Sequence, residues 1–288
     1  AYYLVSEARQ KCANHIFKLG GNVYAFDSTT IDLCLSVFWW AKFRKKKGGI
    51  KVHTLYDVET QIPAFFHITE ASVHDSKVMI EIPYEPSSYY IFDRGYNNFK
   101  ILYKIHQIEA YFVVRAKKNL GYKSIQWKRR LPKNVLSDAS VFLTGFYPKQ
   151  YYPEPLRLVK YWDEEQEREF TFITNAMHIS ALQVAELYKN RWQVELFFKW
   201  LKQHLKIKRF WGTTENAVRI QIYAAICAYC LVAIIQHDMQ LNRSTYEVLQ
   251  ILSISLTDKT HLRDLFDKTK FQNDKERFGP NGPSLFNF

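Results

Sequence analysis

The segment SSYYIFDRGYNNFKILYKIHQIEAYFVVRAK (residues 87–117) decides the predicted fold. Residues 87–96 read as a strand that runs into a glycine turn, and residues 97–108 as a helix. Residues 110–117 read as a further strand. A strand, a helix and a second strand in succession indicate a sheet of the α/β type, with its helices packed on the sheet.

The residues before this segment add three more strands. A β-branched and aromatic run occupies residues 22–35, and the apolar stretches at 50–57 and 62–70 predict a hairpin. Residues 74–82 indicate a helix with Asp75 or Ser76 near its N-cap. Three strands followed by alternating helices and strands predict a mixed sheet flanked by helices.

The character of the sequence changes after residue 118. Residues 119–168 contain turn residues, prolines and short strand-like pieces, which we interpret as a β-rich insertion. Strand character returns at residue 169, one long helix begins near Ser180, and helices continue to about residue 256. We therefore expect an N-terminal helix (1–20), an α/β domain (21–118 and 169–256) and a polar tail (257–288).

Composition narrows the class of partner. The chain has 288 residues, 40 Lys and Arg against 28 Asp and Glu, and a formal net charge of +12. Such an excess favours a polyanionic partner, nucleic acid first. The alternative is a soluble basic protein with scattered lysines. The apolar run at 220–235 is broken by Gln221 and indicates a buried helix rather than a membrane span. No signal peptide is visible, so we expect a cytoplasmic protein.

Three carboxylates stand at places where a charge is costly. Asp27 lies within the first strand, Asp93 at the carboxyl end of a later strand and Glu195 on the long helix. A carboxylate beside a core strand needs an ion pair, hydrogen bonds or a metal. One such residue alone is usually a turn former or a salt-bridge partner. Three together indicate a shared site, and oxygen ligands favour two Mg²⁺ or Mn²⁺ ions.

The helix around Glu195 has a polar stripe beside its packing face. At about 100° per residue, four polar side chains fall within roughly 60° of one another. They are Tyr188, Arg191, Glu195 and Lys202. An ordinary amphipathic helix with an ion pair between Glu195 and Lys199 would give the same pattern. A metal ligand with phosphate contacts beside it also fits the stripe.

Two basic segments are candidates for DNA contacts. Residues 115–133 hold eight Lys and Arg and no acid, with Tyr122 and Trp127 interleaved. A solvated charge run is the alternative, but interleaved aromatic residues favour contacts with a DNA backbone, largely insensitive to sequence. The residues expected to make these contacts are Lys117, Lys118, Trp127, Lys128, Arg129 and Arg130, together with Lys46 and Lys47 from the run at 42–51.

Three motifs resemble those of one enzyme family. The spacing Tyr188-x₂-Arg191-x₃-Glu195-x₆-Lys202 resembles the Tyr-Arg-Glu-Lys signature of DDE transposases of bacterial insertion sequences, in the family numbered four. Asp93-Arg94-Gly95-Tyr96 looks like the second-aspartate motif of that family, and Asp27-Ser28-Thr29 like its first-aspartate region. The resemblance covers about residues 20–240.

The resemblance implies a ribonuclease-H-like fold with the β-rich insertion before the glutamate. It implies Asp27, Asp93 and Glu195 as catalytic ligands of two Mg²⁺ ions, with Mn²⁺ as a substitute. It also implies DNA cleavage at element ends and transfer of the 3′-hydroxyl into target DNA. The implied phosphate contacts near the cleaved end come from Tyr188, Arg191 and Lys202, with Arg94 and Lys199 beside them. Trp127 or Trp162 is a candidate for stacking on a flipped base.

The same resemblance sets the expected partners and setting. They are double-stranded DNA, as element ends and target, and a second copy of the chain in a homodimer. The expected location is the bacterial cytoplasm, at the nucleoid, with no membrane. Residues 1–20 would be the end of an N-terminal domain that reads inverted repeats. Two alternatives stay open: a ribonuclease-H-fold nuclease without strand transfer, and a non-catalytic DNA-binding remnant of a mobile element.

Overall fold

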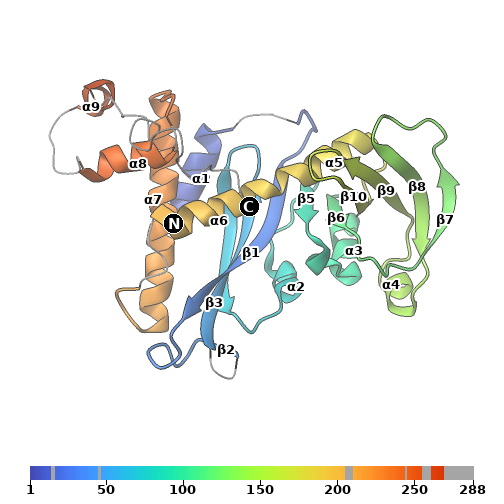
Figure 1. Cartoon of the computed structure of the whole chain (residues 1–288), viewed down its shortest axis with the longest axis horizontal. Coiled ribbons are helices and arrows are strands. Elements are labelled where there is room, and N and C mark those ends of the chain that lie inside the picture. The colour runs from blue at the N-terminus through green and yellow to red at the C-terminus, as the bar shows by residue number, and fades with distance from the viewer. Residues whose placement is uncertain (14–16, 45–46, 205–209, 244, 255–260, 269–288) are drawn as a thin grey trace. The chain divides into compact units, whose positions relative to one another are not determined.

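The computed structural model describes the chain except for residues 14–16, 45–46, 205–209, 244, 255–260 and 269–288. The chain divides into two compact units, Ala1–Cys230 and Leu231–Phe288, which are described one at a time. Figure 1 labels most of the elements of both units. The boundaries expected from the sequence at residues 20, 118, 168 and 256 stay a prediction.

A ten-stranded sheet forms the centre of the first unit. Its strands are β1 (Val23–Leu33), β2 (Lys42–Arg44), β3 (Lys47–Asp57), β4 (Ile62–Glu70), β5 (Tyr89–Phe92), β6 (Tyr111–Arg115), β7 (Tyr122–Trp127), β8 (Val135–Leu143), β9 (Leu156–Asp163) and β10 (Arg168–Thr174). The strand order is β2-β3-β1-β5-β6-β10-β9-β8-β7, with β4 also paired to β3.

Helices and short helical turns precede, connect and follow these strands. They are α1 (Tyr2–Lys11), α2 (Asp75–Val78), η1 (Met79–Glu81), η2 (Arg94–Tyr96), α3 (Phe99–Gln107), α4 (Phe146–Tyr151), α5 (Ala181–Asn190), α6 (Trp192–His204) and α7 (Glu215–Asp238). The N-cap of α2 is His74, which accepts a hydrogen bond from the Ser76 backbone, so Asp75 and Ser76 lie next to the N-cap as predicted.

The part of the sheet from β4 to β6 has a ribonuclease-H-like arrangement. Strands β4, β3 and β1 are successive antiparallel neighbours. Strand β5 is parallel to β1, and β6 is parallel to β5. Helix α3 connects the two parallel strands, as a crossover between parallel strands requires. This confirms the predicted mixed sheet flanked by helices.

Register between β1 and β5 orients the two aspartates. Phe26 pairs with Phe92, and both rings are fully buried in one core cluster. Successive side chains of a strand point to opposite faces of a sheet. Asp27 and Asp93, each the next residue, therefore turn toward the other face. Both strands use the same pattern of two apolar residues and an aspartate, which the sequence repeats as Ala-Phe-Asp and Ile-Phe-Asp.

Helices α5 and α6 lie over the face to which the aspartates turn. The ring of Phe197 on α6 lies 5.3 Å from that of Tyr56 on β3, and Tyr56 pairs with Ala25, two residues before Asp27. Tyr188 on α5 packs 4.7 Å from Phe172 of β10. The opposite face holds the aromatic core and α3. The aromatic core thus lies on the face opposite Asp27 and Asp93.

The insertion extends the same sheet rather than forming a separate body. Strand β10 is antiparallel to β6, and β9, β8 and β7 continue outward by antiparallel pairing. This confirms the predicted β-rich insertion before Glu195. A buried ion pair links β8 to β9. Nε and Nη2 of Arg157 donate to the two carboxylate oxygens of Asp138 at 2.7 and 2.8 Å. Such bidentate pairs fix geometry as well as charge.

The long helix expected from residue 180 is two helices. Helix α5 ends at Asn190 and α6 begins at Trp192. At the junction the Arg191 amide donates to the Tyr188 carbonyl, and the Val194 amide donates to the Arg191 carbonyl. These bonds span three residues instead of four and tighten the chain locally. The expectation of one continuous helix was therefore wrong at Arg191, the residue that faces the acidic side chains.

Helix α7 passes the length and composition test for a membrane span, alone among the described residues. A core helix of a folded protein passes the same test. One stripe of α7 is buried in the first unit, including Val218, Ile222 and Ile226, whereas Ile220 is 59% exposed. The predicted buried helix is therefore confirmed for one face.

The second unit is small and helical. It contains the end of α7, then α8 (Thr245–Ile254) and α9 (Leu262–Lys268). Its core consists of the buried side chains Val232, Val248, Ile251 and Phe266. Most of the expected polar tail lies outside the described residues.

Gly21 offers a test of how β1 and β5 come together. The Tyr89 amide donates to the Asn22 carbonyl at 2.8 Å, and a Cβ at Gly21 would lie 2.0 Å from the Ser87 carbonyl oxygen. We expect Gly21→Ala to lower the free energy of unfolding by about 3 kcal/mol, because the backbone must move. Urea denaturation measures the change. Gly95→Ala is the control, since nothing lies within 4 Å of its added Cβ, and an equally small effect at Gly21 would contradict the close approach.

Candidate active site

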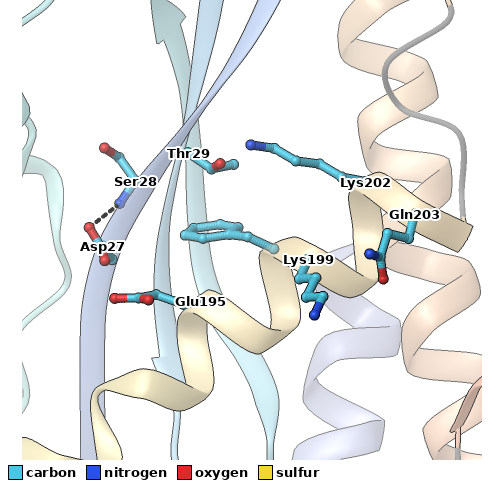
Figure 2. A pocket seen from close by; sticks show the side chains of 8 residues that line it. Asp27, Ser28, Thr29, Glu195, Lys199, Lys202 and Gln203 are labelled. Atoms are coloured by element: carbon cyan, nitrogen blue, oxygen red, sulfur yellow. Dashed lines mark hydrogen bonds between the residues drawn. The ribbon is translucent and has the colours of Figure 1, made fainter. Parts of the chain in front are cut away.

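Asp27, Asp93 and Glu195 come from three separate elements. Asp27 lies within β1, Asp93 follows the last residue of β5, and Glu195 is in the first turn of α6. Figure 2 shows Glu195 pointing from α6 toward Asp27 on β1. The structure therefore brings these two predicted carboxylates to the same side of the sheet, and the strand register turns Asp93 to that side as well.

Arg191 joins Asp27 to Glu195. Its Nη1 lies 2.7 Å from Asp27 Oδ2, and its Nη2 lies 2.5 Å from Glu195 Oε1. The side chains of Arg191 and Asp27 are only 15% and 22% exposed. Burial opposes the charge on Arg191, but the nearby Asp27 and Glu195 carboxylates raise the pKa of the guanidinium. One cation thus holds two carboxylates that would otherwise repel each other.

Tyr188 makes the equivalent contact with the third acid. Its hydroxyl donates to Asp93 Oδ1 at 2.8 Å. The ring packs against Phe170 and Phe172 of β10 at 5.8 and 4.7 Å. Burial, and then the Asp93 charge, raise the pKa of Tyr188 to about 12. Tyr188 therefore stays protonated and remains a donor.

The environment of Asp27 disfavours its charge. Burial raises the pKa of Asp27 to about 6, against the lowering effects of Arg191 and of the Ser28 amide. That amide donates to Asp27 Oδ1 at 2.8 Å. Glu195 and Asp93 raise the pKa further because like charges repel. The site therefore carries more negative charge than its own guanidinium neutralises.

The chemistry of the three acidic side chains suits a divalent cation. Three carboxylates supply oxygen ligands, which hard cations prefer. Added positive charge would offset the repulsion that raises the pKa of Asp27. In the part of the chain that the structure describes, no three acidic, His or Cys side chains stand close enough together to hold an ion. The guanidinium of Arg191 lies between Asp27 and Glu195, so an ion there requires Arg191 to move.

A pocket opens between β1 and α6. It has a volume of about 420 Å³, and its lining is Asp27, Ser28, Thr29, Glu195, Phe198, Lys199, Lys202 and Gln203. Figure 2 shows the amine of Lys202 directed across the pocket toward Thr29. Two cations and two acids thus share one cavity, an arrangement suited to holding a phosphate beside acidic groups.

Three of the predicted DNA contacts lie just after the carboxyl ends of β5 and β6, namely Arg94, Lys117 and Lys118. Arg94 is exposed in η2, directly after Asp93. Lys117 and Lys118 are exposed just after β6, the neighbour of β5.

The other predicted DNA contacts lie elsewhere. Trp127 at the end of β7 is 61% exposed, and Arg129 and Arg130 are exposed after it. Strands β10, β9 and β8 separate β7 from β6, so the structure does not bring these side chains to the pocket. Lys128 is held by Asp138 at 3.1 Å. Lys47 begins β3, and Lys46 lies outside the described residues.

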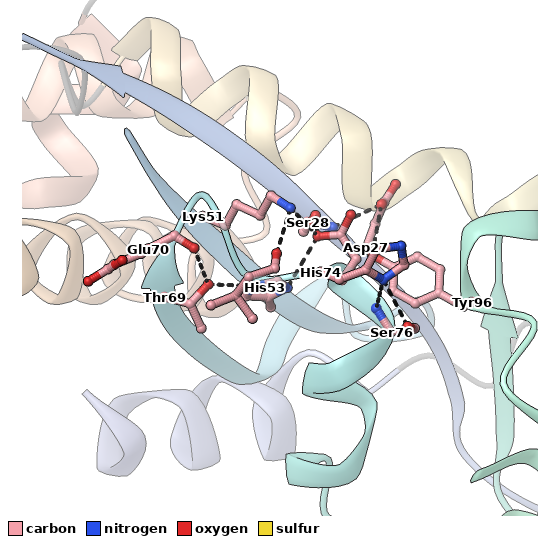
Figure 3. A network of polar contacts seen from close by, with 11 residues as sticks. Asp27, Ser28, Lys51, His53, Thr69, Glu70, His74, Ser76 and Tyr96 are labelled. Carbon is pink, nitrogen blue, oxygen red and sulfur yellow. Dashed lines mark hydrogen bonds and ion pairs between the residues drawn. The ribbon is translucent and has the colours of Figure 1, made fainter. Parts of the chain in front are cut away.

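A second polar network lies behind Asp27 and was missed from the sequence (Figure 3). Asp75, the first residue of α2, accepts a hydrogen bond from Ser28 Oγ at 2.8 Å and pairs with Lys51 Nζ at 3.1 Å. Burial acts against the charge on Asp75, but these two donors lower its pKa. From the sequence, Asp75 was interpreted as part of a helix cap. The signal available in the sequence was the alternation of side chains along β1. It places Ser28, the partner of Asp75, on the face of the sheet opposite Asp27.

His53 is the buried part of this network. Its Nε2 lies 2.9 Å from Thr69 Oγ1, and its Nδ1 lies 3.9 Å from Asp75 Oδ1. The side chain is fully buried, and burial lowers the pKa of His53 to about 4. His53 pairs with Ser28 across β1 and β3. The network therefore supports the strand that carries Asp27 from the side opposite Glu195.

Residues 18–231 match the family model of the transposase DDE domain. The chain belongs to this family. It is 37% identical over 246 residues to y4zB of Sinorhizobium fredii, named as a transposase, with 83% of this chain and 67% of that protein covered. It is 31% identical to a transposase for insertion sequence element IS5377 of Geobacillus stearothermophilus, with 71% of this chain and 54% of that protein covered.

A third relative and a solved structure are more distant. The transposase for insertion sequence element IS4SA of Synechocystis is 25% identical, with 82% of this chain and 67% of that protein covered. A piggyBac transposase in a synaptic complex with hairpin DNA is 13% identical at a TM-score of 0.49, with 85% of this chain and 56% of that chain covered. The present chain thus spans between half and two thirds of these proteins. DDE transposases act on DNA and generally use divalent metal ions.

Removal of Arg191 tests the bridge. We expect Arg191→Gln to lower the free energy of unfolding by about 2–3 kcal/mol in the absence of metal, because it leaves two partly buried carboxylates without their cation. A divalent cation should restore part of this loss. Urea denaturation with and without the cation measures both effects.

The control is Arg219→Gln, which removes an exposed pair with Glu215 on α7 and should cost below about 0.5 kcal/mol. Equal effects of the two substitutions would contradict a bridging role for Arg191.

His53 gives a prediction for pH. The unfolded chain binds a proton at His53 near pH 6.5, whereas the folded chain does so only near pH 4. The contribution of His53 to the free energy of unfolding should therefore fall by about 3 kcal/mol as the pH drops from 6.5 to 4. His53→Gln should remove this dependence, seen as the difference between the two proteins in urea denaturation at several pH values.

Thr69→Val is the matched variant, because it removes the hydrogen-bond partner of His53 without removing the titrating group. It should lower stability by about 1 kcal/mol and keep the pH dependence. A difference between wild type and His53→Gln that does not vary with pH would contradict the buried neutral imidazole.

Proposed function

We propose that the chain is the catalytic part of a transposase that cleaves DNA at the ends of an insertion sequence. It then joins the released 3′-hydroxyl to target DNA. Asp27, Asp93 and Glu195 are the proposed catalytic acids. The observation that carries the proposal is the placement of these acids on one side of the sheet, each held by Arg191 or Tyr188, in a chain of the DDE transposase family.

The acids would hold two Mg²⁺ ions, which would activate the attacking oxygen and stabilise the leaving oxygen. Mg²⁺ is the finer assignment within the divalent ions that the family uses, and Mn²⁺ would substitute for it. The raised pKa of Asp27 supports a place for added positive charge there. The network of Asp75, Lys51 and His53 would hold the Asp27 strand still while the acids exchange partners.

The basic residues would position the DNA backbone. Lys199 and Lys202 line the pocket beside Asp27 and Glu195, within reach of the phosphate at the cleaved end. Arg191, once displaced from the carboxylates, presents a planar fork that suits a phosphate. The Tyr188 hydroxyl would then donate a hydrogen bond to the same backbone. Arg94, Lys117 and Lys118 would follow the duplex along the sheet edge.

The expected partners are element ends, target DNA and a second copy of this chain. The net charge of +12 supports a polyanionic partner. Joining two element ends to one target calls for two active sites, which supports the proposed homodimer. A nucleoid location follows from the DNA substrate. Nothing in the described residues favours the nuclease or remnant alternatives over this proposal.

Strand transfer with a pre-cleaved element end, target plasmid and Mg²⁺ tests the proposal. Wild-type protein should form joined product. Asp93→Asn and Glu195→Gln should reduce the joining rate at least about 100-fold, because each removes an acid on which the chemistry depends. Both variants should still bind the duplex in a fluorescence anisotropy assay.

Glu186→Gln is the matched control, an exposed carboxylate on α5, and should join DNA at the wild-type rate. Joined product that persists in Asp93→Asn would contradict the assignment of Asp27, Asp93 and Glu195 as the catalytic acids. Cleavage of an intact end without any joining would instead support the nuclease alternative.

A further inference from the structure

Two exposed loops meet beyond the far end of the pocket. One follows β1 and spans residues 34–41, and the other spans residues 210–214 between α6 and α7. The ring of Phe38 lies 6.1 Å from that of Phe210. The Trp40 indole donates to the Thr213 carbonyl at 2.8 Å. The loops therefore form one surface, although they are about 170 residues apart in the sequence.

This surface exposes apolar side chains. Trp39 is 75% exposed and Trp211 is 97% exposed, which makes them the two most exposed of the seven tryptophans. Val37 in the first loop is 46% exposed. Burying a tryptophan ring contributes strongly to stability, so two rings left in solvent have no role in the folded core. Rings left so exposed indicate a surface that meets a partner.

The surface continues the pocket. Strand β1 runs from Asp27 to Leu33, and α6 runs alongside from Glu195 past Lys199 and Lys202. Six strand residues span about 20 Å. Stacked DNA rises about 3.4 Å per nucleotide, so this length corresponds to about six nucleotides. A strand that leaves the acids through the pocket thus reaches the loops after about six nucleotides.

The sequence around both loops is basic. KFRKKK (42–47) follows the first loop, and KIKR (206–209) precedes the second. Aromatic side chains between basic residues are the pattern of surfaces that bind single-stranded nucleic acid by stacking and by charge. A second copy of the chain, with its own charge of +12, is a less complementary partner for this surface.

We propose that Trp39 and Trp211 form a stacking platform for unpaired bases of a DNA strand that leaves the pocket. This rests on the proposed DNA-cleaving function and adds a binding site to it. The strand passes Lys199 and Lys202 as it leaves the acids. Its bases then stack on the indole rings about six nucleotides from the cleaved phosphate. Every base has a face that can stack, so the site acts without sequence preference.

The test compares duplexes of the element end that carry single-stranded extensions beyond the cleaved position. Extensions of two and eight nucleotides are added to the 3′ or the 5′ strand, and Kd is measured by fluorescence anisotropy. In wild-type protein the eight-nucleotide extension on one strand should tighten Kd about tenfold over the two-nucleotide one. Trp39→Ala and Trp211→Ala should each reduce this gain, and the double variant should abolish it.

Phe146→Ala is the control, since Phe146 is 80% exposed on α4, which packs against α3 and β8. It should keep the full gain. All variants should bind and join the short substrate as wild type does, which separates failure of this site from failure of the proposed function. An undiminished gain in the double variant would overturn the proposal. So would a double variant that loses the gain and the dimers in light scattering together, because the surface would then be a protein contact.

Discussion

Charge repulsion among three acids is the constraint on which the rest of the site depends. Asp27 is mostly buried and lies close enough to Glu195 and Asp93 for both to disfavour its charge. In the folded chain, Arg191 donates hydrogen bonds to two of the acids and Tyr188 donates one to the third. An ion pair between a guanidinium and a carboxylate can open without disrupting the fold, whereas a buried apolar contact cannot. Arg191 and Tyr188 thus offset a repulsion that, under the proposed function, metal ions would also offset.

The sheet makes this repulsion unavoidable. Phe26 and Phe92 pair across parallel strands and fill the core, which forces the next residue of each strand to the other face. The break between α5 and α6 then brings Arg191 over that face. Behind the strand, Asp75 accepts a hydrogen bond from Ser28 and lies beside Lys51 and buried His53. The acids are thus fixed by strand register on one side and by a polar network on the other.

The mixed sheet and the positions of Asp27 and Asp93 along its strands were predictable because local patterns determine them. The repeated Ala-Phe-Asp and Ile-Phe-Asp patterns place an aspartate after a buried ring in each strand, and the hairpin at 50–70 follows from alternation. The family was recognised from the spacing of Tyr188, Arg191, Glu195 and Lys202. The helix break at Arg191 was not predictable, since apolar periodicity runs through it. The partnership of Asp75 with Ser28 and Lys51 was missed because it joins three segments distant in sequence. Likewise, only the folded chain shows the Trp39 and Trp211 loops meeting.

The central claim is that Asp27, Asp93 and Glu195 form one cation site from which Arg191 withdraws. Anomalous X-ray scattering from Mn²⁺ in crystals of the chain bound to a cleaved element end tests it most directly. The account predicts anomalous peaks within about 2.0–2.6 Å of oxygens from all three carboxylates. It also predicts that the Arg191 guanidinium has moved from Asp27 to a DNA phosphate. Peaks elsewhere, with Arg191 still bridging Asp27 and Glu195, would contradict it.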